Sequence, residues 1–359
     1  MMSGPESHEK AWLISLPEIF DGLASQILQA LATTSFTRLG REYYLIKTNN
    51  PAAIHNSEVA KFLRWNLPIH HTWPCRPQRM GGFVEKAAQT LVRKFGHHTQ
   101  QGIFMGPLHP GSPDKYYKSL ASNLRGRTLQ LFPSLTANSI EEQAPDLTSL
   151  FCLVGKEGLF CGMQSPRSSN GLYPGGSKFI DKTAPDTISR AGAKIAEALH
   201  YLLMHRPPLA PGSHWIELGA CPGGMTSELL ARGQRVTAID RAPLDARLNN
   251  SEGLTFVLKD VGDFNPPPAT AYDAMLSDLN GPPEESMAHI ARLLPYLRES
   301  GLLVFTLKVP KIASVEEPCA LFRKIACQAD GYGLRLFAQT HLTHNRHEFT
   351  LFFEKLKTS

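Results

Sequence analysis

The sequence predicts an α/β protein whose C-terminal half is a doubly wound, mostly parallel sheet. Apolar runs of strand length alternate there with helical patterns, an order typical of parallel sheets covered by helices. The strand-like runs span 214–218, 235–239, 254–258, 272–277 and 301–307, and the helical patterns lie near 226–232, 286–298 and 316–328. Two last runs, 334–342 and 348–356, are separated by one short turn and therefore predict a closing antiparallel hairpin.

The composition is that of an ordinary soluble protein with more than one domain. The chain has 359 residues, 42% hydrophobic and 19% charged, so we expect two or three domains with well-packed cores. No apolar run approaches the roughly 20 residues of a membrane span, and the start lacks the charged-then-apolar order of a signal peptide. Six dispersed cysteines without a C-x-x-C pair favour reduced thiols, so a cytoplasmic protein without a membrane partner is expected.

The N-terminal half predicts smaller α+β structure. Strand patterns occupy 11–16 and 41–47 around a helical pattern over 19–32, and further helices are expected over 81–95 and 116–124. The apolar runs 150–154 and 158–162, joined by a short turn, predict a hairpin. Residues 164–178 are rich in Ser, Gly and Pro, which suits either an RNA-contacting loop or a linker.

Basic residues are concentrated between Lys61 and Arg127. Eleven Lys and Arg residues face only Glu85 and Asp114 in this stretch, which gives it a net charge of +9. Aromatic and histidine residues are interleaved with them: Trp65, Trp73, Tyr116, Tyr117 and histidines 70, 71, 97, 98 and 109. Cations beside aromatic faces suit a polyanion with stackable bases, such as RNA. A solvated basic surface without a partner explains the charge equally well.

A Gly/Pro loop joins the first strand of the C-terminal half to a helical pattern within Trp215–Leu230. Gly219, Gly223 and Gly224 remove side chains that would keep a small ligand from the backbone N–H groups. The spacing, with a proline inside the loop, differs from the G-x-G-x-x-G of dinucleotide-binding folds. The loop therefore predicts a ligand site without naming the ligand.

Carboxylates follow three of the strand-like runs, at Asp240, Asp260 and Asp278. Ligands of open α/β sheets bind at the carboxyl ends of the strands, and an acid after the second strand typically holds the ribose hydroxyls. These residues suit either an adenine dinucleotide or S-adenosylmethionine (SAM). Each acid alone is equally consistent with a strand-end or surface residue.

Asp278 and Lys308 end adjacent apolar runs of the predicted sheet. A lysine that ends a buried strand beside another cation is well placed to lose its proton and accept one from a hydroxyl group. Taken alone, Lys308 is more simply a strand-end lysine that reaches solvent.

Metal and thiol chemistry are disfavoured. His341, His344 and His347 fall in the hairpin turn rather than on one helix face, so no metal site is expected. No motif places a histidine to activate Cys221 as a nucleophile, and backbone contacts to the ligand are the better interpretation of that residue.

Four motifs together resemble the FtsJ-type RNA 2′-O-ribose methyltransferases. They are E-L-G-A-C-P-G-G-M-T, S-D-L-N-G, F-T-L-K-V-P and H-N-R-H-E-F-T, and the resemblance is strong over 186–356. It is closest to the 23S ribosomal RNA ribose methyltransferase M group. This implies a ferredoxin-like α+β domain over 1–60, a basic THUMP-like RNA-binding domain over 61–180 and a Rossmann-like SAM-dependent methyltransferase domain over 181–359.

The resemblance also implies site residues. The catalytic tetrad of the family corresponds to Lys194, Asp278, Lys308 and Glu348, with Lys194 supplied by a helix that begins Ser189-Arg190 and continues to Glu197. The implied SAM contacts are Ser189, Cys221, Pro222, Gly223, Gly224, Asp240, Asp260 and Asp278. Two positions depart from the pattern: Glu217 replaces a common aspartate, and His347 replaces an acid that often precedes the glutamate.

The expected function is SAM-dependent 2′-O-ribose methylation of ribosomal RNA, at a 23S cytidine, without a metal and without an obligate protein partner. Lys308 is expected to act as the base, Lys194 to place a positive charge beside it, and Asp278 and Glu348 to orient the two lysines. The alternatives are a non-catalytic RNA-binding or ribosome-assembly factor and a dinucleotide-dependent oxidoreductase. Retention of all four tetrad residues disfavours the first, and the loop spacing disfavours the second.

Overall fold

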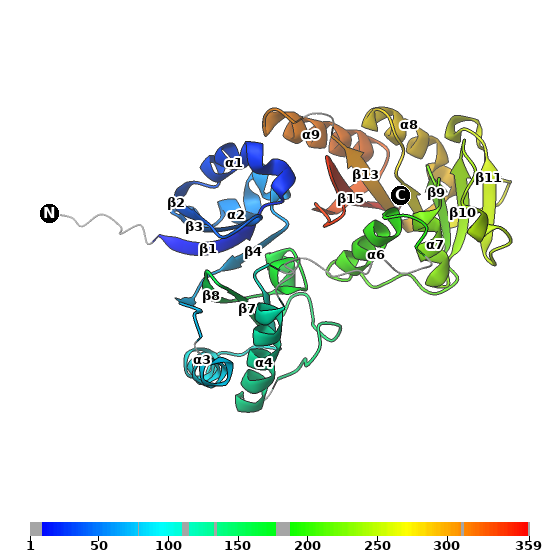
Figure 1. Cartoon of the computed structure of the whole chain (residues 1–359). Helices are drawn as coiled ribbons and strands as arrows, with labels where there is room; N and C mark the ends of the chain where they lie inside the picture. The colour runs from blue at the N-terminus through cyan, green and yellow to red at the C-terminus, as the bar shows by residue number, and fades with distance from the viewer. Residues whose placement is uncertain are drawn as a thin grey trace. The chain divides into compact units, whose positions relative to one another are not determined.

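The computed structural model describes residues 9–77, 79–109, 115–132, 135–176, 187–309 and 312–357. The chain divides into two compact units, residues 1–177 and 178–359, and each is described by itself (Figure 1). No helix in the described ranges is long and apolar enough to cross a membrane.

The first sheet of the first unit has the order β2-β3-β1-β4, with β1 antiparallel to both β3 and β4. Its strands are β1 (Lys10–Ser15), β2 (Thr33–Arg38), β3 (Tyr43–Thr48) and β4 (Trp65–Pro68). Its helices are η1 (Glu18–Leu23), α1 (Ala24–Ala30), α2 (Ala53–Asn56) and η2 (Glu58–Phe62). The single helix predicted over 19–32 is therefore two consecutive shorter helices, and β2 was not predicted.

The second sheet of the first unit has the order β5-β8-β7-β6, in which β7 pairs antiparallel with β8 and parallel with β6. Its strands are β5 (His71–Trp73), β6 (Ile103–Pro107), β7 (Ser149–Gly155) and β8 (Gly158–Gln164). Its helices are α3 (Met80–Phe95) and α4 (Tyr116–Leu131), followed by α5 (Pro166–Ser169) and η3 (Pro174–Gly176). The predicted hairpin over 150–162 is confirmed.

Strand β7 is buried on both faces, and its alternating side chains belong to two different cores. Cys152 packs with Leu91 and Leu124 of α3 and α4, whereas Phe151 packs with Leu13 and Trp65 of the first sheet. Because successive side chains of a strand point to opposite faces, this one strand joins the two sheets into a single unit.

The second unit contains a seven-stranded sheet of order β11-β10-β9-β12-β13-β15-β14. The first five strands are parallel, and β15 runs antiparallel to both β13 and β14. Its strands are β9 (His214–Leu218), β10 (Arg235–Asp240), β11 (Leu254–Leu258), β12 (Tyr272–Ser277), β13 (Leu297–Lys308), β14 (Leu334–Thr340) and β15 (Glu348–Lys355). The predicted Rossmann-like α/β fold, with its parallel sheet and closing hairpin, is confirmed.

Helices cover both faces of this sheet: α6 (Ala191–Leu202) and α7 (Gly224–Ala231) on one side, α8 (Pro283–Leu293) and α9 (Glu316–Gly331) on the other (Figure 1). The helix predicted over 286–298 ends at Leu293, because Pro295 lacks the N–H that a longer helix requires, and β13 begins at Leu297. Short 3₁₀ turns occupy η4 (Ala246–Leu248), η5 (Val261–Asp263) and η6 (Leu294–Tyr296).

The strand order reverses between β9 and β12, the two neighbours at the centre of the sheet. In open α/β sheets such a switch point opens a crevice at the carboxyl ends of the strands, where ligands bind. The residues that follow β9, β10, β12 and β13 are therefore the ones to inspect for a site.

Candidate active site

The loop after β9 is built for a close approach to its backbone. Gly219 and Gly223 have φ angles of +82° and +101°, a left-handed conformation that favours glycine, and the Cys221–Pro222 peptide is cis. A Cβ atom at Gly224 would lie 2.0 Å from the Oγ of Ser189. Ser189 Oγ also accepts a hydrogen bond from the N–H of Ala191, the first residue of α6, at 3.3 Å. The loop and the start of α6 thus lie against each other.

Asp240, at the end of β10, is part of the same site. Its two carboxylate oxygens accept hydrogen bonds from the N–H groups of Cys221 (2.8 Å) and Ala242 (2.9 Å). Asp260, after β11, accepts from the N–H of Gly262 at 2.7 Å, and its side chain is 43% exposed. The structure places Asp240 directly on the glycine loop, whereas Asp260 lies at the neighbouring strand end with its Oδ2 3.6 Å from Arg241 Nε.

The four predicted tetrad residues converge at the edge of the sheet where the parallel strands β12 and β13 end. Lys194 Nζ lies 2.7 Å from Glu348 Oε1 and 3.3 Å from Asp278 Oδ2. Lys308 Nζ lies 3.3 Å from the other oxygen of Asp278, Oδ1. Asp278 thus bridges the two lysines, and the exposed fractions of the four side chains are only 11–27%.

The sheet explains why these residues meet. Lys308 ends β13 and Glu348 begins β15, and the antiparallel register pairs them directly. Asp278 follows β12, and its N–H donates to the carbonyl of Leu218 in β9 at 3.1 Å. Lys194 comes from α6, which covers this edge of the sheet. The neighbouring ends of β12, β13 and β15 therefore supply three of the four groups.

The electrostatics hold Lys194 as a cation. Burial lowers the pKa of Lys194, but the carboxylates of Asp278 and Glu348 outweigh that effect and raise the pKa above its usual value. Two lysines and two carboxylates cancel in formal charge, which makes a partly buried cluster of this size tolerable.

Sequence reasoning missed the contact between Asn280 and Lys308. Lys308 Nζ donates to Asn280 Oδ1 at 2.7 Å and to the carbonyl of Asp278 at 3.0 Å. Asn280 lies two residues after Asp278 in the S-D-L-N-G segment, so the strand-end position was a usable signal.

Glu217 carries a buried carboxyl group beneath the loop. The residue is 2% exposed and accepts a hydrogen bond from Thr226 Oγ1 at 2.7 Å. Burial raises its pKa to about 8, the Thr226 hydrogen bond opposes this, and Asp278 and Asp240 raise it further. A glutamate at this strand position is therefore protonated near neutral pH.

The thiol of Cys221 is a poor nucleophile. Burial and the negative charge of Asp240 raise its pKa above the ordinary value, so less of it is thiolate at neutral pH. His341 is buried, with Nε2 2.9 Å from the carbonyl of Arg346. No cluster of three or more metal-ligating side chains occurs in the described part of the chain.

Several basic residues of the stretch 61–127 form ion pairs or hydrogen bonds within the protein. Arg64 is 4% exposed and pairs with Glu42 at 2.5 Å, and Arg127 pairs with Glu85 at 2.7 Å. Arg125 donates to the carbonyl of Ile103 at 2.9 Å. Asp114 lies outside the described residues. The count of eleven cations therefore overstates the charge that is open to a partner.

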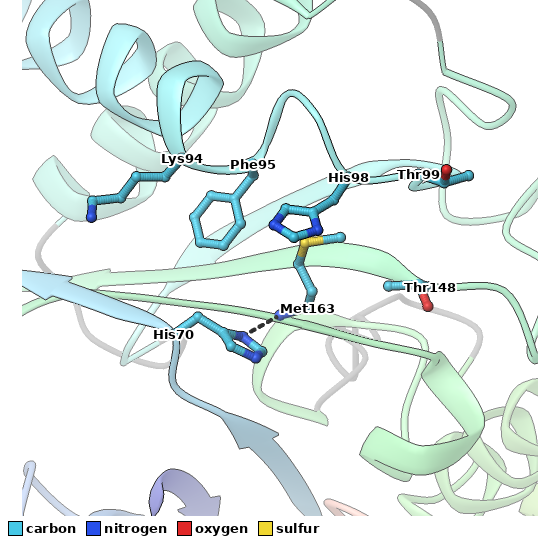
Figure 2. Close-up of a pocket in the computed structure, with 7 residues that line it drawn as sticks. All are labelled: His70, Lys94, Phe95, His98, Thr99, Thr148 and Met163. Carbon is cyan, nitrogen blue, oxygen red and sulfur yellow. Dashed lines mark hydrogen bonds between the residues drawn. The ribbon is translucent and has the colours of Figure 1, made fainter.

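A pocket of about 510 Å³ opens within this basic stretch (Figure 2). It is lined by His70, Lys94, Phe95, His98, Thr99, Thr148 and Met163. His70 Nδ1 accepts from the N–H of Met163 at 3.1 Å, and burial, with His98 and Lys10, lowers the pKa of His70. The lining thus combines the exposed Lys94 with aromatic, imidazole and hydroxyl side chains.

Comparison with known proteins places similar sequences over this part of the chain. Residues 187–311 match the family described as FtsJ-like methyltransferase. The chain is similar to proteins named ribosomal RNA large subunit methyltransferase M. That of Halorhodospira halophila is 34% identical over 47% of both chains, and that of Mannheimia succiniciproducens is 31% identical over 47% of this chain and 48% of its own. That of Shewanella amazonensis is 28% identical over 68% of this chain and 70% of its own.

The chain spans about half the length of the first two of these relatives. The predicted resemblance is nevertheless confirmed, because the match covers the glycine loop and three of the four tetrad residues. Residues 187–311 thus match the FtsJ-like methyltransferase family, and the chain is similar to proteins named ribosomal RNA large subunit methyltransferase M.

Proposed function

We propose that this protein transfers the methyl group of SAM to a ribose 2′-hydroxyl of ribosomal RNA, at a 23S cytidine, in the cytoplasm. The observation that carries the proposal is the convergence of Lys194, Asp278, Lys308 and Glu348 beside the glycine loop of an FtsJ-like domain. This arrangement combines a donor site with a group that can accept a hydroxyl proton.

The donor site fits SAM. Without a Cβ at Gly224 the Ser189 hydroxyl packs directly on the loop, and the N–H of Cys221 donates to the carboxylate of Asp240. Ser189 and the loop residues Cys221, Pro222, Gly223 and Gly224 are assigned to the methionine end. Asp240 and Asp260 are assigned to the ribose and base, and Asp278 to the methionine end.

Lys308 is the proposed base. SAM, when bound, supplies a methyl group already activated by its sulfonium. The ribose hydroxyl is a weak nucleophile until Lys308 Nζ accepts its proton. SAM would then supply its methyl group to this oxygen, and the carbon–sulfur bond would break. Asp278 orients Lys308, and Glu348 and Asp278 hold Lys194 as the neighbouring cation.

The first unit is the proposed RNA-binding part. The order β1-α1-β2-β3-α2-β4 in an antiparallel sheet supports a ferredoxin-like domain, assigned to 1–60 and extended by β4 to Pro68. The second sheet with α3 and α4 is the proposed THUMP-like domain of 61–180, before the methyltransferase domain of 181–359. The pocket around Lys94 and His98 supports contact with RNA phosphates.

Protein-free 23S ribosomal RNA and SAM are the substrates for the test. Purified protein should produce 2′-O-methylcytidine, detected by mass spectrometry of the digested RNA. Lys308→Ala should bind SAM with unchanged affinity, measured by calorimetry, and give no product. Lys324→Ala, an exposed lysine paired with Glu284 on the far side of the sheet, is the matched control. Undiminished turnover by Lys308→Ala contradicts the assignment of the base.

Two other outcomes would redirect the proposal. RNA binding without any SAM-dependent product favours a non-catalytic assembly factor. Binding of NADH in preference to SAM, measured in the same calorimeter, favours an oxidoreductase. Mapping ribose methylation in a strain that lacks the protein identifies the target nucleotide.

A further inference from the structure

Helix α6 carries a second buried ionisable residue one turn after Lys194. Glu197 is 5% exposed and lies three residues along the helix from Lys194, so both side chains are on the same face. The carboxylate of Glu197 meets Thr343, which lies in the turn between β14 and β15. It accepts from the N–H of Thr343 at 3.1 Å and 2.9 Å and from Thr343 Oγ1 at 2.7 Å.

Hydrogen bonds to the Glu197 carboxylate are stronger than hydrogen bonds between neutral groups. A buried carboxylate is costly unless its oxygens are hydrogen-bonded, and bonds to a charged acceptor are about twice as strong as neutral ones. The Thr343 side chain is itself exposed, so burial of that side chain does not hold the turn in place. His341, Leu342 and Asn345 of the same turn are buried, so Glu197 adds to that packing by fixing Thr343 itself with three hydrogen bonds.

The same turn delivers a tetrad residue. Glu348 begins β15 five residues after Thr343, and its Oε1 reaches Lys194 Nζ at 2.7 Å. At the other end of the turn, the N–H of Val309 donates to the carbonyl of His347 at 2.8 Å, next to Lys308. One face of α6 therefore makes two contacts with this segment. Glu197 binds the turn at Thr343, and Lys194 binds Glu348, which follows the turn.

We propose that Glu197 is a positioning residue for methyl transfer, which fixes the 341–347 turn through Thr343 so that Glu348 meets Lys194. The inference rests on the proposed function. Loss of the contact lets the turn shift and takes one counter-charge from Lys194, while the glycine loop and Asp240 are untouched. The chemical step should slow while SAM binding is preserved.

The test compares Glu197→Gln, Thr343→Val and a control, Glu354→Gln. Glu354 lies on β15 with Glu348 but pairs with Arg335 at the far end of the strand. Glu197→Gln should lower kcat by about 10- to 100-fold, the range expected when a reacting group is displaced by about 1 Å. The KM values for SAM and RNA should stay unchanged. Amide hydrogen exchange should rise in residues 341–347 and nowhere else in the second unit.

Thr343→Val removes only the hydroxyl donor and keeps the shape of an exposed side chain, so it should fold. It should lower kcat less than Glu197→Gln does, and the double variant should be no slower than Glu197→Gln, because the two changes break one contact. Glu197→Asp, which keeps the charge, should recover part of the lost kcat. Glu354→Gln should match the wild type.

Two results would overturn the inference. One is a kcat for Glu197→Gln within about twofold of the wild type, well short of the loss expected from displacement. The other is a loss of SAM affinity with raised exchange throughout the second unit, which indicates a general structural role. Failure of the wild type to methylate RNA overturns the proposed function instead. The contact between Glu197 and the turn is then tested by amide hydrogen exchange alone. Exchange in residues 341–347 that is the same in Glu197→Gln as in the wild type overturns the inference.

Discussion

Lys308 and Glu348 face each other in register across β13 and β15, yet each side chain pairs with a different residue. Glu348 Oε1 lies 2.7 Å from Lys194, and Lys308 Nζ lies 3.3 Å from Asp278 Oδ1. The tetrad is therefore a row of alternating negative and positive charge, Glu348–Lys194–Asp278–Lys308. Glu348 begins β15, and Lys308 ends the adjacent strand β13. Each variant should report the function of its own position in this chain.

Asn280→Ala should slow methyl transfer without weakening SAM binding. Asn280 Oδ1 is the nearest acceptor of Lys308 Nζ, at 2.7 Å, so its loss removes the contact that orients the Lys308 side chain. We expect kcat to fall about tenfold, less than the ~10²- to 10⁴-fold contribution of a whole general base. Single-turnover kinetics with saturating SAM measure the step.

Asn265→Ala is the control for this variant, because Asn265 also accepts from an exposed cation, Arg292, at 3.0 Å. It should react as the wild type does. A normal kcat for Asn280→Ala would show that Asp278 alone positions Lys308.

Gly224→Ala should weaken SAM binding. The added Cβ would lie 2.0 Å from Ser189 Oγ and 3.2 Å from the N–H of Gly192, so the start of α6 must move away from the loop. Overpacking of this kind costs ~1–3 kcal/mol, and about 1.4 kcal/mol is tenfold in affinity. Calorimetry with SAM measures the loss.

Gly331→Ala makes the same chemical change where the new Cβ meets no atom within 4 Å. Its SAM affinity should equal that of the wild type. Equal affinity for Gly224→Ala as well would place the donor away from the Ser189–Gly224 contact.

The fold of the second unit was predictable because its strands are continuous apolar runs. The buried part of β13, for example, contains the uninterrupted apolar run Leu302–Phe305. Strand β2 was missed because its residues, Thr33–Arg38, are mostly polar and exposed at a sheet edge. Likewise, the 3₁₀ start of the first helix, Glu18–Leu23, follows the same apolar pattern that an α-helix has.

The site was only partly predictable for a different reason. Strand-end position pointed to Asp278 and Lys308, but the pairing of Lys308 with Glu348 depends on the β13–β15 register. Contacts such as that of Glu197 with Thr343 join residues 146 positions apart. Charge counting also treated Arg64 as available, although the fold pairs it with Glu42. A sequence shows residue types, whereas these outcomes depend on which residues the fold brings together.

Lys94→Ala should weaken binding to 23S ribosomal RNA and reduce its salt dependence. Lys94 is exposed and lines the pocket shown in Figure 2, next to Phe95. Loss of one phosphate contact should lower the slope of log affinity against log salt by about one. Filter binding between low and moderate salt measures both effects.

Lys47→Ala is the matched control, since Lys47 lies outside the basic stretch and is near Glu9 at 3.8 Å. It should leave the slope unchanged. An unchanged slope for Lys94→Ala would remove this pocket from the RNA-binding surface.

Glu217→Gln should stabilise the second unit, and by more as the pH rises. Burial raises the pKa of Glu217 to about 8, so between its ordinary value near 4.5 and about 8 the folded state keeps a proton that the unfolded state has lost. The stability from this group is therefore complete below pH ~4.5 and is lost as the pH rises through about 8.

Glutamine keeps the hydrogen-bonding shape without titrating, so the difference in Tm between variant and wild type should widen from pH 5 to pH 8 and then level off. Thermal melts at unit steps of pH measure it, with Glu228→Gln, a surface glutamate paired with Arg232, as the control that shows no such trend. If the curves of Glu217→Gln and the wild type run parallel, Glu217 is ionised in the folded protein. Its charge must then be balanced by more than the single hydrogen bond from Thr226.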